Sequence, residues 1–403
     1  MNQSNDVRMN IMQKIYLDQA ATSFPKAPGT ADAVFRFMTE CGCNVGRGSY
    51  AGAYSAEELV YDTRMLLCRL FGCGCDPAGP KRVVFTKNVT ESLNVLLKGL
   101  LRPGDHVLVS SLEHNAVMRP LRQLEKQGIL FDRVACAADG SMDLKDLKDR
   151  ILPSTKAVVM LHASNVCGTV LPAAQIGAVC RARGIRFILD AAQTAGVLPL
   201  DMEGMCVDAL AFTGHKGLLG PQGTGGFLIR EDLAGELEPL ISGGTGSISH
   251  MEEIPSFLPD RFEAGTLNLP GIAGLKASLF WLSEQPEGSV LAHELNLTAR
   301  FLRKMEALEN EGLIRFVGKH STEERVGVVS IVPLRLDPAE LAFRLDERYG
   351  IATRVGLHCA PAAHRTLGTF PGGTVRFSFG PFNTDAEIDQ AAEAVRKICR
   401  KEN

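Results

Sequence analysis

Short apolar runs alternate with longer amphipathic runs through the first half of the chain. Between about Lys81 and Arg230 the strand-like runs are RVVF, HVLVSS, KAVVMLH, RFILDAA, ALAFTG and GGFLIR, and helix-like runs separate several of them. Strands that alternate with helices usually join through right-handed crossovers and form a mostly parallel sheet. KAVVMLH is apolar on both faces, as in strands that helices cover on both sides. This half of the chain therefore predicts an α/β core.

The pattern changes after about Gly288. A long helix-like run, VLAHELNLTARFLRKMEALENEG, precedes strand-like VGVVSIVPL, helix-like PAELAFRLDERYG, strand-like TVRFSFG and a last helix that starts near Asp385. This mixture is typical of a separate α+β domain. A chain of 403 residues is long enough for two cores. We predict a large domain over residues 15–265 and a small one over 266–403, with segment 1–14 packing on the small domain.

The composition is that of an ordinary globular protein, with 45% hydrophobic and 22% charged residues and a net charge of -3. A nucleic-acid-binding protein would show a basic excess or a basic stripe, so no nucleic acid is expected as a partner. No apolar run approaches the roughly 18 residues that a membrane helix needs, and the N-terminus lacks the apolar core of a signal peptide. We therefore expect a cytoplasmic protein with no membrane partner.

The 11 cysteines are odd in number and lie scattered through apolar segments. This distribution suits a reducing compartment and argues against a disulfide framework. The pairs Cys41/Cys43 and Cys73/Cys75 lack the spacing of a zinc site, so no metal is predicted.

Polar residues follow directly after five of the predicted strands. In an open α/β sheet the ligand lies beyond the carboxyl ends of the strands, so these residues are candidates for a site. The first cluster, 86–90, opens a helix whose free N–H groups and dipole suit a phosphate. The other four clusters are Glu113 and His114, Ser164 and Asn165, Asp190 and Gln193, and His215 and Lys216. They converge on one site if the sheet forms as predicted.

The tetrapeptide Thr213-Gly214-His215-Lys216 is the most informative of these clusters, because its lysine follows Asp190 by 26 residues. Pyridoxal 5'-phosphate (PLP) requires an amine for covalent attachment and a carboxylate that holds the proton of its pyridinium nitrogen. A strand that ends in an acid and another that ends in a lysine supply both, so we predict PLP as the cofactor. Neither a dinucleotide fingerprint nor a phosphate loop with GK[ST] is present, which argues against NAD and ATP.

Simpler explanations exist for several of these residues. Asp190 and Gln193 fit a helix capping box, and Thr90 fits a helix N-cap without a phosphate. His114 fits a buried core histidine. Arg376 lies in an apolar strand and needs an anionic partner, which is either a substrate carboxylate or a structural salt bridge.

Nine short motifs, in order, resemble those of the class V aminotransferase family of PLP enzymes, and within it the SUF-type cysteine desulfurases and selenocysteine lyases. They are YLDQAAT, TKNVTESLN, LEHNAV, HASNVCGTVLP, LDAAQTAG, FTGHKGLLGPQGTG, FEAGTLNLPGI, RVGLHCAP and VRFSFGPFNT. The resemblance covers nearly the whole chain. It implies PLP-dependent transferase fold type I, with a mostly parallel seven-stranded sheet in a large α/β domain and a smaller α+β C-terminal domain.

The resemblance implies a role for each matching residue. Lys216 would attach the cofactor and then act as the base at the substrate's Cα. Asp190 would pair with the pyridinium nitrogen, His114 would stack on the ring, and Gln193 would bind the phenolic oxygen. Four further residues would complete the cofactor site, the last three of them at the phosphate: Val89, Thr90, Thr213 and His215.

The resemblance also implies a substrate site and a homodimer. Asn165 would contact the cofactor and, together with Arg376, bind the substrate carboxylate, the arginine through two parallel hydrogen bonds. Arg354 matches a further active-site arginine of the SUF-type group. Thr266 matches a residue that is donated to the cofactor phosphate of the neighbouring subunit, so two subunits would share their sites.

Cys359 indicates which of the reactions open to a PLP enzyme this protein would catalyse. In the desulfurases that this chain resembles, a cysteine thiolate attacks the sulfur of the PLP-bound cysteine, takes it up as a persulfide and leaves alanine. The neighbouring Arg354 and His358 are expected to favour the thiolate electrostatically. The prediction is a PLP-dependent cysteine desulfurase that uses L-cysteine or L-selenocysteine, with a sulfur-acceptor protein as a further partner.

The chain departs from the SUF-type pattern at four places. Leu357 stands where a second histidine is common, and AAHRTLGTFPG replaces the usual apolar continuation after the cysteine. Thr213 replaces a frequent serine, and Cys167 adds a thiol near the expected substrate pocket. Two alternatives stay open: a selenocysteine lyase that uses the same residues, and a class V aminotransferase or C–S lyase in which Cys359 has no role. The intact Lys216 and Arg376 argue against a non-catalytic interaction protein.

Overall fold

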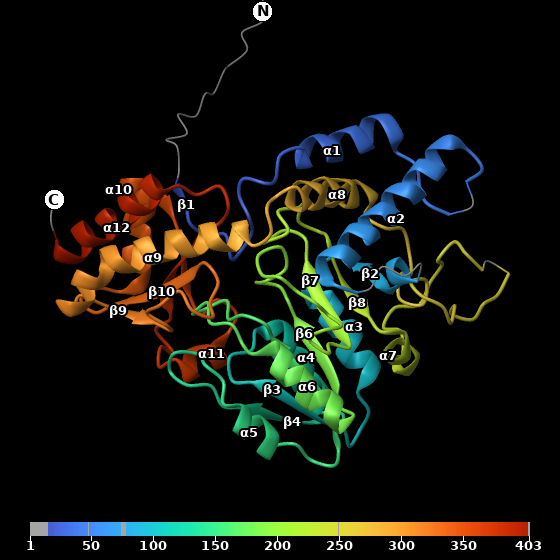
Figure 1. Ribbon diagram of the computed structural model, residues 1–403, viewed down its shortest axis with the longest axis horizontal. Coiled ribbons are helices and arrows are strands. Elements are labelled where there is room, and N and C mark those ends of the chain that lie inside the picture. The colour runs from blue at the N-terminus through green and yellow to red at the C-terminus, as the bar shows by residue number, and fades with distance from the viewer. Residues whose placement is uncertain (1–14, 47, 74–77, 249, 402–403) are drawn as a thin grey trace, which may run out of the picture.

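The structure is a computed structural model that describes residues 15–46, 48–73, 78–248 and 250–401. Figure 1 shows a large part around an extended sheet and, beside it, a smaller part that contains the C-terminal helices. Segment 1–14, which we expected to pack on the small domain, lies outside the described residues. The domain boundary after residue 265 stays a prediction.

The large part is built on a seven-stranded sheet. In chain order its strands are β2 (Val83–Thr86), β3 (His106–Ser110), β4 (Leu130–Val134), β5 (Thr155–Leu161), β6 (Arg186–Asp190), β7 (Ala209–Thr213) and β8 (Gly225–Ile229). Their spatial order is β2-β8-β7-β6-β5-β3-β4. β8 is antiparallel to both of its neighbours, and the other pairs are parallel. This confirms the mostly parallel seven-stranded sheet and the α/β fold.

Helices cover both faces of this sheet. Successive residues of a strand point to opposite faces, and in the central strands the residues on both faces are apolar. In β5, Val158 and Met160 belong to one buried cluster, whereas Ala157 and Val159 belong to another on the opposite face. The first cluster includes residues of α2 (Ala51–Phe71), α6 (Ala173–Arg183) and α8 (Leu269–Ser283). The second includes residues of α3 (Val89–Leu100), α4 (Asn115–Glu125) and α7 (Glu231–Glu236).

The small part has a four-stranded antiparallel sheet of order β12-β13-β10-β9. Its strands are β9 (Ile314–Val317), β10 (Val328–Pro333), β12 (Arg354–Gly356) and β13 (Thr374–Ser378). Its apolar core includes residues of α9 (Ser289–Asn310), α10 (Pro338–Tyr349) and α12 (Asp385–Arg400). Phe301 of α9 packs on Phe377 with ring centroids 4.7 Å apart. These elements agree with the α+β pattern in the C-terminal sequence.

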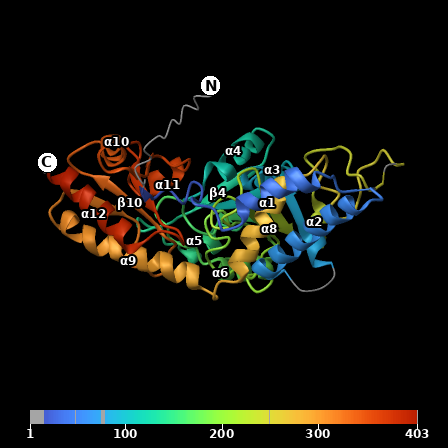
Figure 2. The same ribbon diagram turned by 90° about the horizontal axis from the view of Figure 1, so that it is seen from above.

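Shorter elements complete the chain. They are β1 (Ile15–Tyr16), α1 (Thr30–Arg36), a π-helical turn (Phe37–Cys41), a 3-10 turn (Gly79–Arg82), α5 (Leu144–Asp149), β11 (Ile351–Ala352) and α11 (Pro361–Thr366). α8 contacts both α1 and α2, and these three helices lie together in both views (Figures 1 and 2). None of the helices in the described parts of the chain has the length and apolarity that a membrane span requires.

The N-terminal segment connects the two parts. β1 pairs in parallel with β11 of the small part, and Asp18 then forms a bridge with Ser378, the last residue of β13. A few residues later the backbone N–H of Ser23 donates to the carbonyl of His215 over 2.8 Å. The segment therefore crosses the edge of the large sheet at the carboxyl ends of its parallel strands.

Candidate active site

Lys216 follows β7, and the neighbouring strand β6 ends in Asp190. Burial lowers the pKa of the Lys216 amine to about 8, and the positive charges of Arg376 and Arg354 act in the same direction. Asp190 and Asp18 oppose this shift. About a tenth of the amine is therefore neutral at pH 7, far more than for an ordinary lysine, and the neutral form is the one that attacks an aldehyde.

Asp190 is buried at the end of β6 and points its carboxylate into the same region. Its Oδ1 accepts a hydrogen bond from Ala192 N over 2.9 Å, and burial raises its pKa despite this bond and the nearby Lys216. The capping-box explanation is wrong, because the residues after Asp190 form turns and no helix starts there. Gln193 instead donates to the carbonyl of Ala20 over 3.1 Å.

His114 forms the N-cap of α4, where its Nδ1 accepts from Ala116 N over 3.0 Å. Burial lowers its pKa to about 4, together with the positive charges of Lys216, Arg119 and Arg376. The imidazole is therefore neutral, and its proton lies on Nε2. A neutral, fixed ring at this place suits stacking on a flat cofactor.

Three buried polar atoms around Lys216 lack a hydrogen-bond partner within the described chain. They are Thr213 Oγ1, His215 Nδ1 and Asn165 Oδ1. Buried polar groups are normally paired, because an unpaired one costs roughly 1–3 kcal/mol. Burial, with Lys216 and Lys26, lowers the pKa of His215 to about 4, so its ring is neutral and its free nitrogen is available to a ligand.

The residues around Lys216 fit PLP. They provide a buried amine for the aldehyde, a buried carboxylate for the pyridinium nitrogen, a neutral ring for stacking, and an unpaired hydroxyl and imidazole for polar oxygens. Bound there, PLP would supply a ring that accepts the electron pair released at the substrate's Cα.

The first turn of α3 is also at this edge of the sheet. Asn88 is its N-cap, and its side chain accepts from Glu91 N over 3.0 Å. The N-cap explanation for Thr90 is therefore wrong, because Thr90 lies inside the helix with an exposed side chain. Val89 is buried, and its role in cofactor binding stays a prediction.

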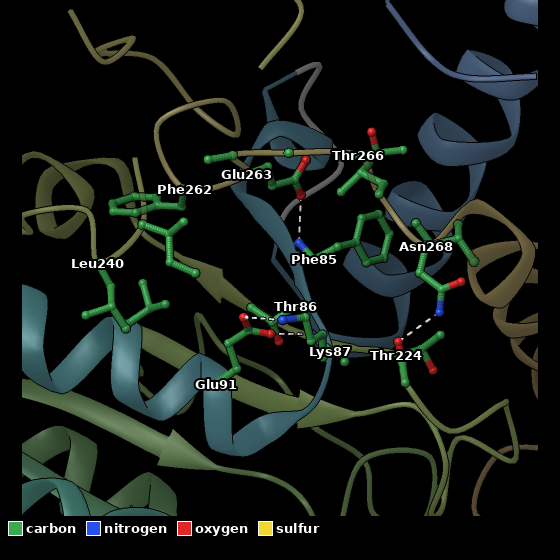
Figure 3. A pocket seen from close by; sticks show the side chains of 18 residues that line it. Phe85, Thr86, Lys87, Glu91, Thr224, Leu240, Phe262, Glu263, Thr266 and Asn268 are labelled. Atoms are coloured by element: carbon green, nitrogen blue, oxygen red, sulfur yellow. Dashed lines mark hydrogen bonds and ion pairs between the residues drawn. The ribbon is translucent and has the colours of Figure 1, made fainter. Parts of the chain in front are cut away.

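Thr266 does not lie with this group. It is exposed and lines a different cavity, together with Phe85, Phe262 and Leu240 (Figure 3). None of the residues with unpaired atoms around Lys216 lines that cavity. Within one chain Thr266 and Lys216 thus line different cavities, and the role of Thr266 at the phosphate of a second subunit stays a prediction.

The two candidate substrate arginines lie side by side on neighbouring strands. Arg354 of β12 is paired in register with Arg376 of β13. Arg376 is almost fully buried and donates through Nη1 to the carbonyl of Asn165 over 3.0 Å, while its Nε has no partner among the described residues. Both arginines form an ion pair with Asp18, which the sequence had not indicated as a site residue.

Cys359 is exposed on a loop between β12 and α11. The loop is tied to the large part, because Asn165 Nδ2 donates to the carbonyl of His358 over 2.7 Å and Asn115 N donates to the carbonyl of Cys359 over 2.8 Å. His358 and Cys359 have φ angles of 47° and 56°, a left-handed conformation that is uncommon outside glycine. The thiol is therefore presented by a constrained backbone at the junction of the two parts.

One expectation for this loop is wrong. Burial lowers the pKa of His358 to about 2, with contributions from Arg376 and His364, so its ring is neutral and provides no positive charge for the thiolate. Its Nε2 pairs with Thr374 Oγ1 at 2.8 Å, which fixes the ring in the small part. Cys167 is fully buried, and its thiol donates to Thr169 Oγ1 over 3.4 Å.

Two buried carboxyl groups near the site were not assigned a role from the sequence. Glu113 accepts from Ser110 Oγ and from Leu161 N, and burial raises its pKa to about 8. Glu294 of α9 lines a cavity that Lys216 also lines, and burial raises its pKa to about 8 as well. In the sequence Glu294 reads as one more polar residue of an amphipathic helix, so no pattern singles it out.

The fold and this site define a PLP-dependent enzyme of fold type I: a large sheet with a buried lysine at a strand end, and a small α+β part that contributes two arginines and a cysteine. The model of the family described as aminotransferase class-V matches residues 15–391. The chain therefore belongs to the class V aminotransferase family, whose members use PLP.

Relatives and solved structures agree with this family. The chain is 36% identical to a probable cysteine desulfurase of Aeropyrum pernix, over 95% of this chain and 94% of the relative. It is 32% identical to a probable cysteine desulfurase of Methanothermobacter thermautotrophicus, over 98% of both. The apo structure of a cysteine desulfurase from Thermococcus onnurineus NA1 superposes with a TM-score of 0.88 at 29% identity, over 100% of this chain and 99% of that one.

Capture of PLP by the cofactor-free protein is expected to accelerate as the pH rises toward about 8 and then to level off. The neutral amine of Lys216 is the reactive form, and its pKa is lowered from 10.5 to about 8. Below that value its neutral fraction grows about tenfold per pH unit. The rate of covalent attachment, trapped by borohydride and measured by mass, checks this profile. A rate that still climbs steeply up to pH 10 would show that the amine titrates as an ordinary lysine.

Proposed function

We propose that this protein is a PLP-dependent cysteine desulfurase, which converts L-cysteine to L-alanine and keeps the sulfur as a persulfide on Cys359. The observation that carries the proposal is the exposed thiol of Cys359, on a loop fastened to Asn165, the residue whose carbonyl also binds Arg376. A transaminase has no use for a thiol at this place. Relatives over nearly the whole chain are named as cysteine desulfurases, which supports the same reaction.

The residues of the site can carry out this reaction in sequence. Arg376, with an unpaired Nε, binds the substrate carboxylate, and Arg354 lies next to it. Lys216, as a neutral amine, takes the proton from the substrate's Cα. His114 is neutral, and its ring would stack on the bound cofactor and limit the cofactor's movement.

The Cys359 thiolate then attacks the substrate sulfur. A sulfur–sulfur bond forms, the bond between that sulfur and the substrate's Cβ breaks, and its electron pair stays with the carbon, which takes up a proton. Alanine leaves, and the persulfide on Cys359 holds the sulfur until a thiol acceptor removes it. The exposed position of Cys359 supports delivery to an acceptor protein, because the acceptor's thiol must reach the persulfide from solvent.

We also propose a homodimer with shared sites. The exposed apolar residues of the large part include Leu240, Ile241, Met251, Ile254 and Phe257. Leu240 and Ile241 line the same cavity as Thr266 (Figure 3). Exposed apolar surface of this kind marks protein contacts. A molar mass in solution equal to one chain would contradict the dimer.

A cytoplasmic location belongs to the same proposal. Eight cysteines of the described residues are free thiols, which suits a reducing compartment: Cys41, Cys43, Cys136, Cys167, Cys180, Cys206, Cys359 and Cys399. L-Cysteine is the proposed substrate, and L-selenocysteine uses the same residues because selenium and sulfur occupy the same place on Cβ.

Product analysis tests the reaction class. The PLP-loaded protein is incubated with L-cysteine, L-selenocysteine and ordinary amino donors in the presence of a thiol, and alanine, sulfide or selenide, pyruvate and other keto acids are measured. The proposal expects alanine and sulfide in equal amounts from L-cysteine. Pyruvate in place of alanine would identify a C–S lyase, keto acids from ordinary donors would identify an aminotransferase, and turnover of selenocysteine alone would identify a selenocysteine lyase.

A further inference from the structure

The carbonyl oxygen of His215, the residue directly before Lys216, is surrounded by four hydrogen-bond donors of the N-terminal segment. Ser23 N lies 2.8 Å from it, and Ser23 Oγ, Thr22 Oγ1 and Lys26 Nζ each lie 3.1 Å from it. A carbonyl oxygen has only two lone pairs, so these donors compete for it. The ammonium of Lys26 is the strongest of them, because a charged donor forms a hydrogen bond roughly twice as strong as a neutral one.

Lys26 uses all three of its N–H donors at this place. In addition to the carbonyl of His215, its Nζ donates to Ser23 Oγ over 3.0 Å and to Thr22 Oγ1 over 3.3 Å. The side chain is half-buried, and burial lowers its pKa to about 8 with no carboxylate of the described chain to oppose the shift. A charge that is removed from water without a counter-ion destabilises a fold. Stability alone therefore does not favour a lysine at position 26.

The rest of the N-terminal segment is fixed as well. The side chain of Gln19 pairs with both backbone groups of Phe24, since its Nε2 donates to the carbonyl over 2.8 Å and its Oε1 accepts from the N–H over 3.0 Å. Further on, Ala27 N donates to the carbonyl of Leu219 over 3.2 Å. Leu219 N in turn donates to the carbonyl of Lys216 over 2.8 Å. The segment is thus attached to the backbone on both sides of Lys216.

We infer that Lys26 is a positioning residue: its ammonium holds the His215 carbonyl and thereby sets where the Lys216 amine and the His215 ring stand toward the bound cofactor. His215 Nδ1 is buried and unpaired within the described chain, and Lys216 supplies the amine, so a shift of this backbone moves two groups that face the cofactor. A displacement of about 1 Å can reduce a rate by as much as about 10²-fold. The inference depends on Lys216 as the attachment residue and is independent of the substrate.

A purely structural role for Lys26 makes a different prediction. If Lys26 only stabilises the fold, its loss lowers the fraction of folded protein, and each folded molecule still captures PLP as the wild type does. If Lys26 positions the lysine, the folded molecules themselves capture PLP slowly and hold it in a changed orientation. The rate constant of capture and the visible circular dichroism per bound cofactor distinguish the two roles, because neither depends on how much protein is folded.

The test compares the cofactor-free wild type with Lys26→Met and Lys26→Arg during capture of PLP. Lys26→Met keeps a similar length and removes the charge and all three donors, so the rate constant is expected to fall about tenfold and the circular dichroism per bound cofactor to change. Lys26→Arg retains a charged donor and is expected to restore most of the rate and the signal. An unchanged rate constant and signal in folded Lys26→Met, or equal defects in both variants, would overturn the inference.

Lys148→Met is the matched control, because Lys148 is an exposed lysine of α5 and its loss is expected to leave capture unchanged. Thr22→Val covers the case in which Lys26→Met does not fold. It removes one donor to the His215 carbonyl and one acceptor of Lys26, so capture is expected to slow by a smaller factor, and an unchanged rate would also overturn the inference. Capture involves no substrate, so the proposed function fails separately, if the wild type releases no alanine from L-cysteine.

Discussion

Replacing Lys216 with alanine is expected to abolish turnover of L-cysteine, with a loss of at least about 10⁴-fold, because one side chain both attaches the cofactor and moves the proton at Cα. Lys216 is the amine at the end of β7 whose pKa burial lowers to about 8. The variant is expected to retain PLP only weakly and to yield no cofactor adduct after borohydride reduction. Steady-state rates and the mass of the reduced protein measure both effects.

The matched control for this variant is Lys145→Ala. Lys145 is an exposed lysine whose side chain pairs with Asp149 of the same short helix, so its loss is expected to leave activity and cofactor attachment unchanged. A Lys216→Ala protein that still forms a borohydride-stable adduct would show that another lysine holds the cofactor, and the assignment of the site would be wrong.

Replacing Cys359 with serine is expected to reduce sulfur release from L-cysteine by about 10³-fold or more, while PLP stays attached to Lys216. The hydroxyl of serine fits the same space but is a far weaker nucleophile toward sulfur than a thiolate. Sulfide release and the visible absorbance of the cofactor, measured on the same sample, separate the two effects. Cofactor loss in step with activity would point to a structural role for Cys359 in the loop.

Cys206→Ser is the matched control for the thiol. Cys206 is also a free cysteine, and its φ angle of 56° equals that of Cys359, so a serine meets the same backbone conformation at both positions. Activity is expected to survive this change. Equal losses of activity in the two variants would show that backbone strain, and not the missing thiol, causes the loss. Normal turnover by Cys359→Ser would favour an aminotransferase or C–S lyase.

The strands that the sequence predicted best are those that are buried on both faces and therefore stand out as apolar segments. β3, β7 and β8 are buried along their whole length and appear as continuous apolar runs. β4 was not predicted, because it lies at the edge of the sheet and only Val134 of its five residues is buried. An edge strand of this kind carries little periodic signal, and its pairing with β3 is a tertiary effect.

The residues of the candidate site also differ in how far the sequence reveals them. Asp190 and Lys216 were found because Asp190 ends β6 and Lys216 closely follows β7, and the local sequence shows both strands. Asp18 was not found, because its partners Arg354 and Arg376 are 336 and 358 residues away and only the fold brings them together. The neutral state of His358 also depends on burial, which the sequence of its loop does not reveal.

The central claim is that Cys359 takes the sulfur of the substrate, and labelling tests it most directly. The PLP-loaded protein is mixed with an equal amount of L-cysteine carrying heavy sulfur and no thiol acceptor, then alkylated, digested and analysed by mass spectrometry. The account predicts one labelled sulfur atom on the peptide that contains Cys359 and one alanine for each labelled peptide. Label on a different cysteine, or pyruvate with no label on the protein, would contradict it.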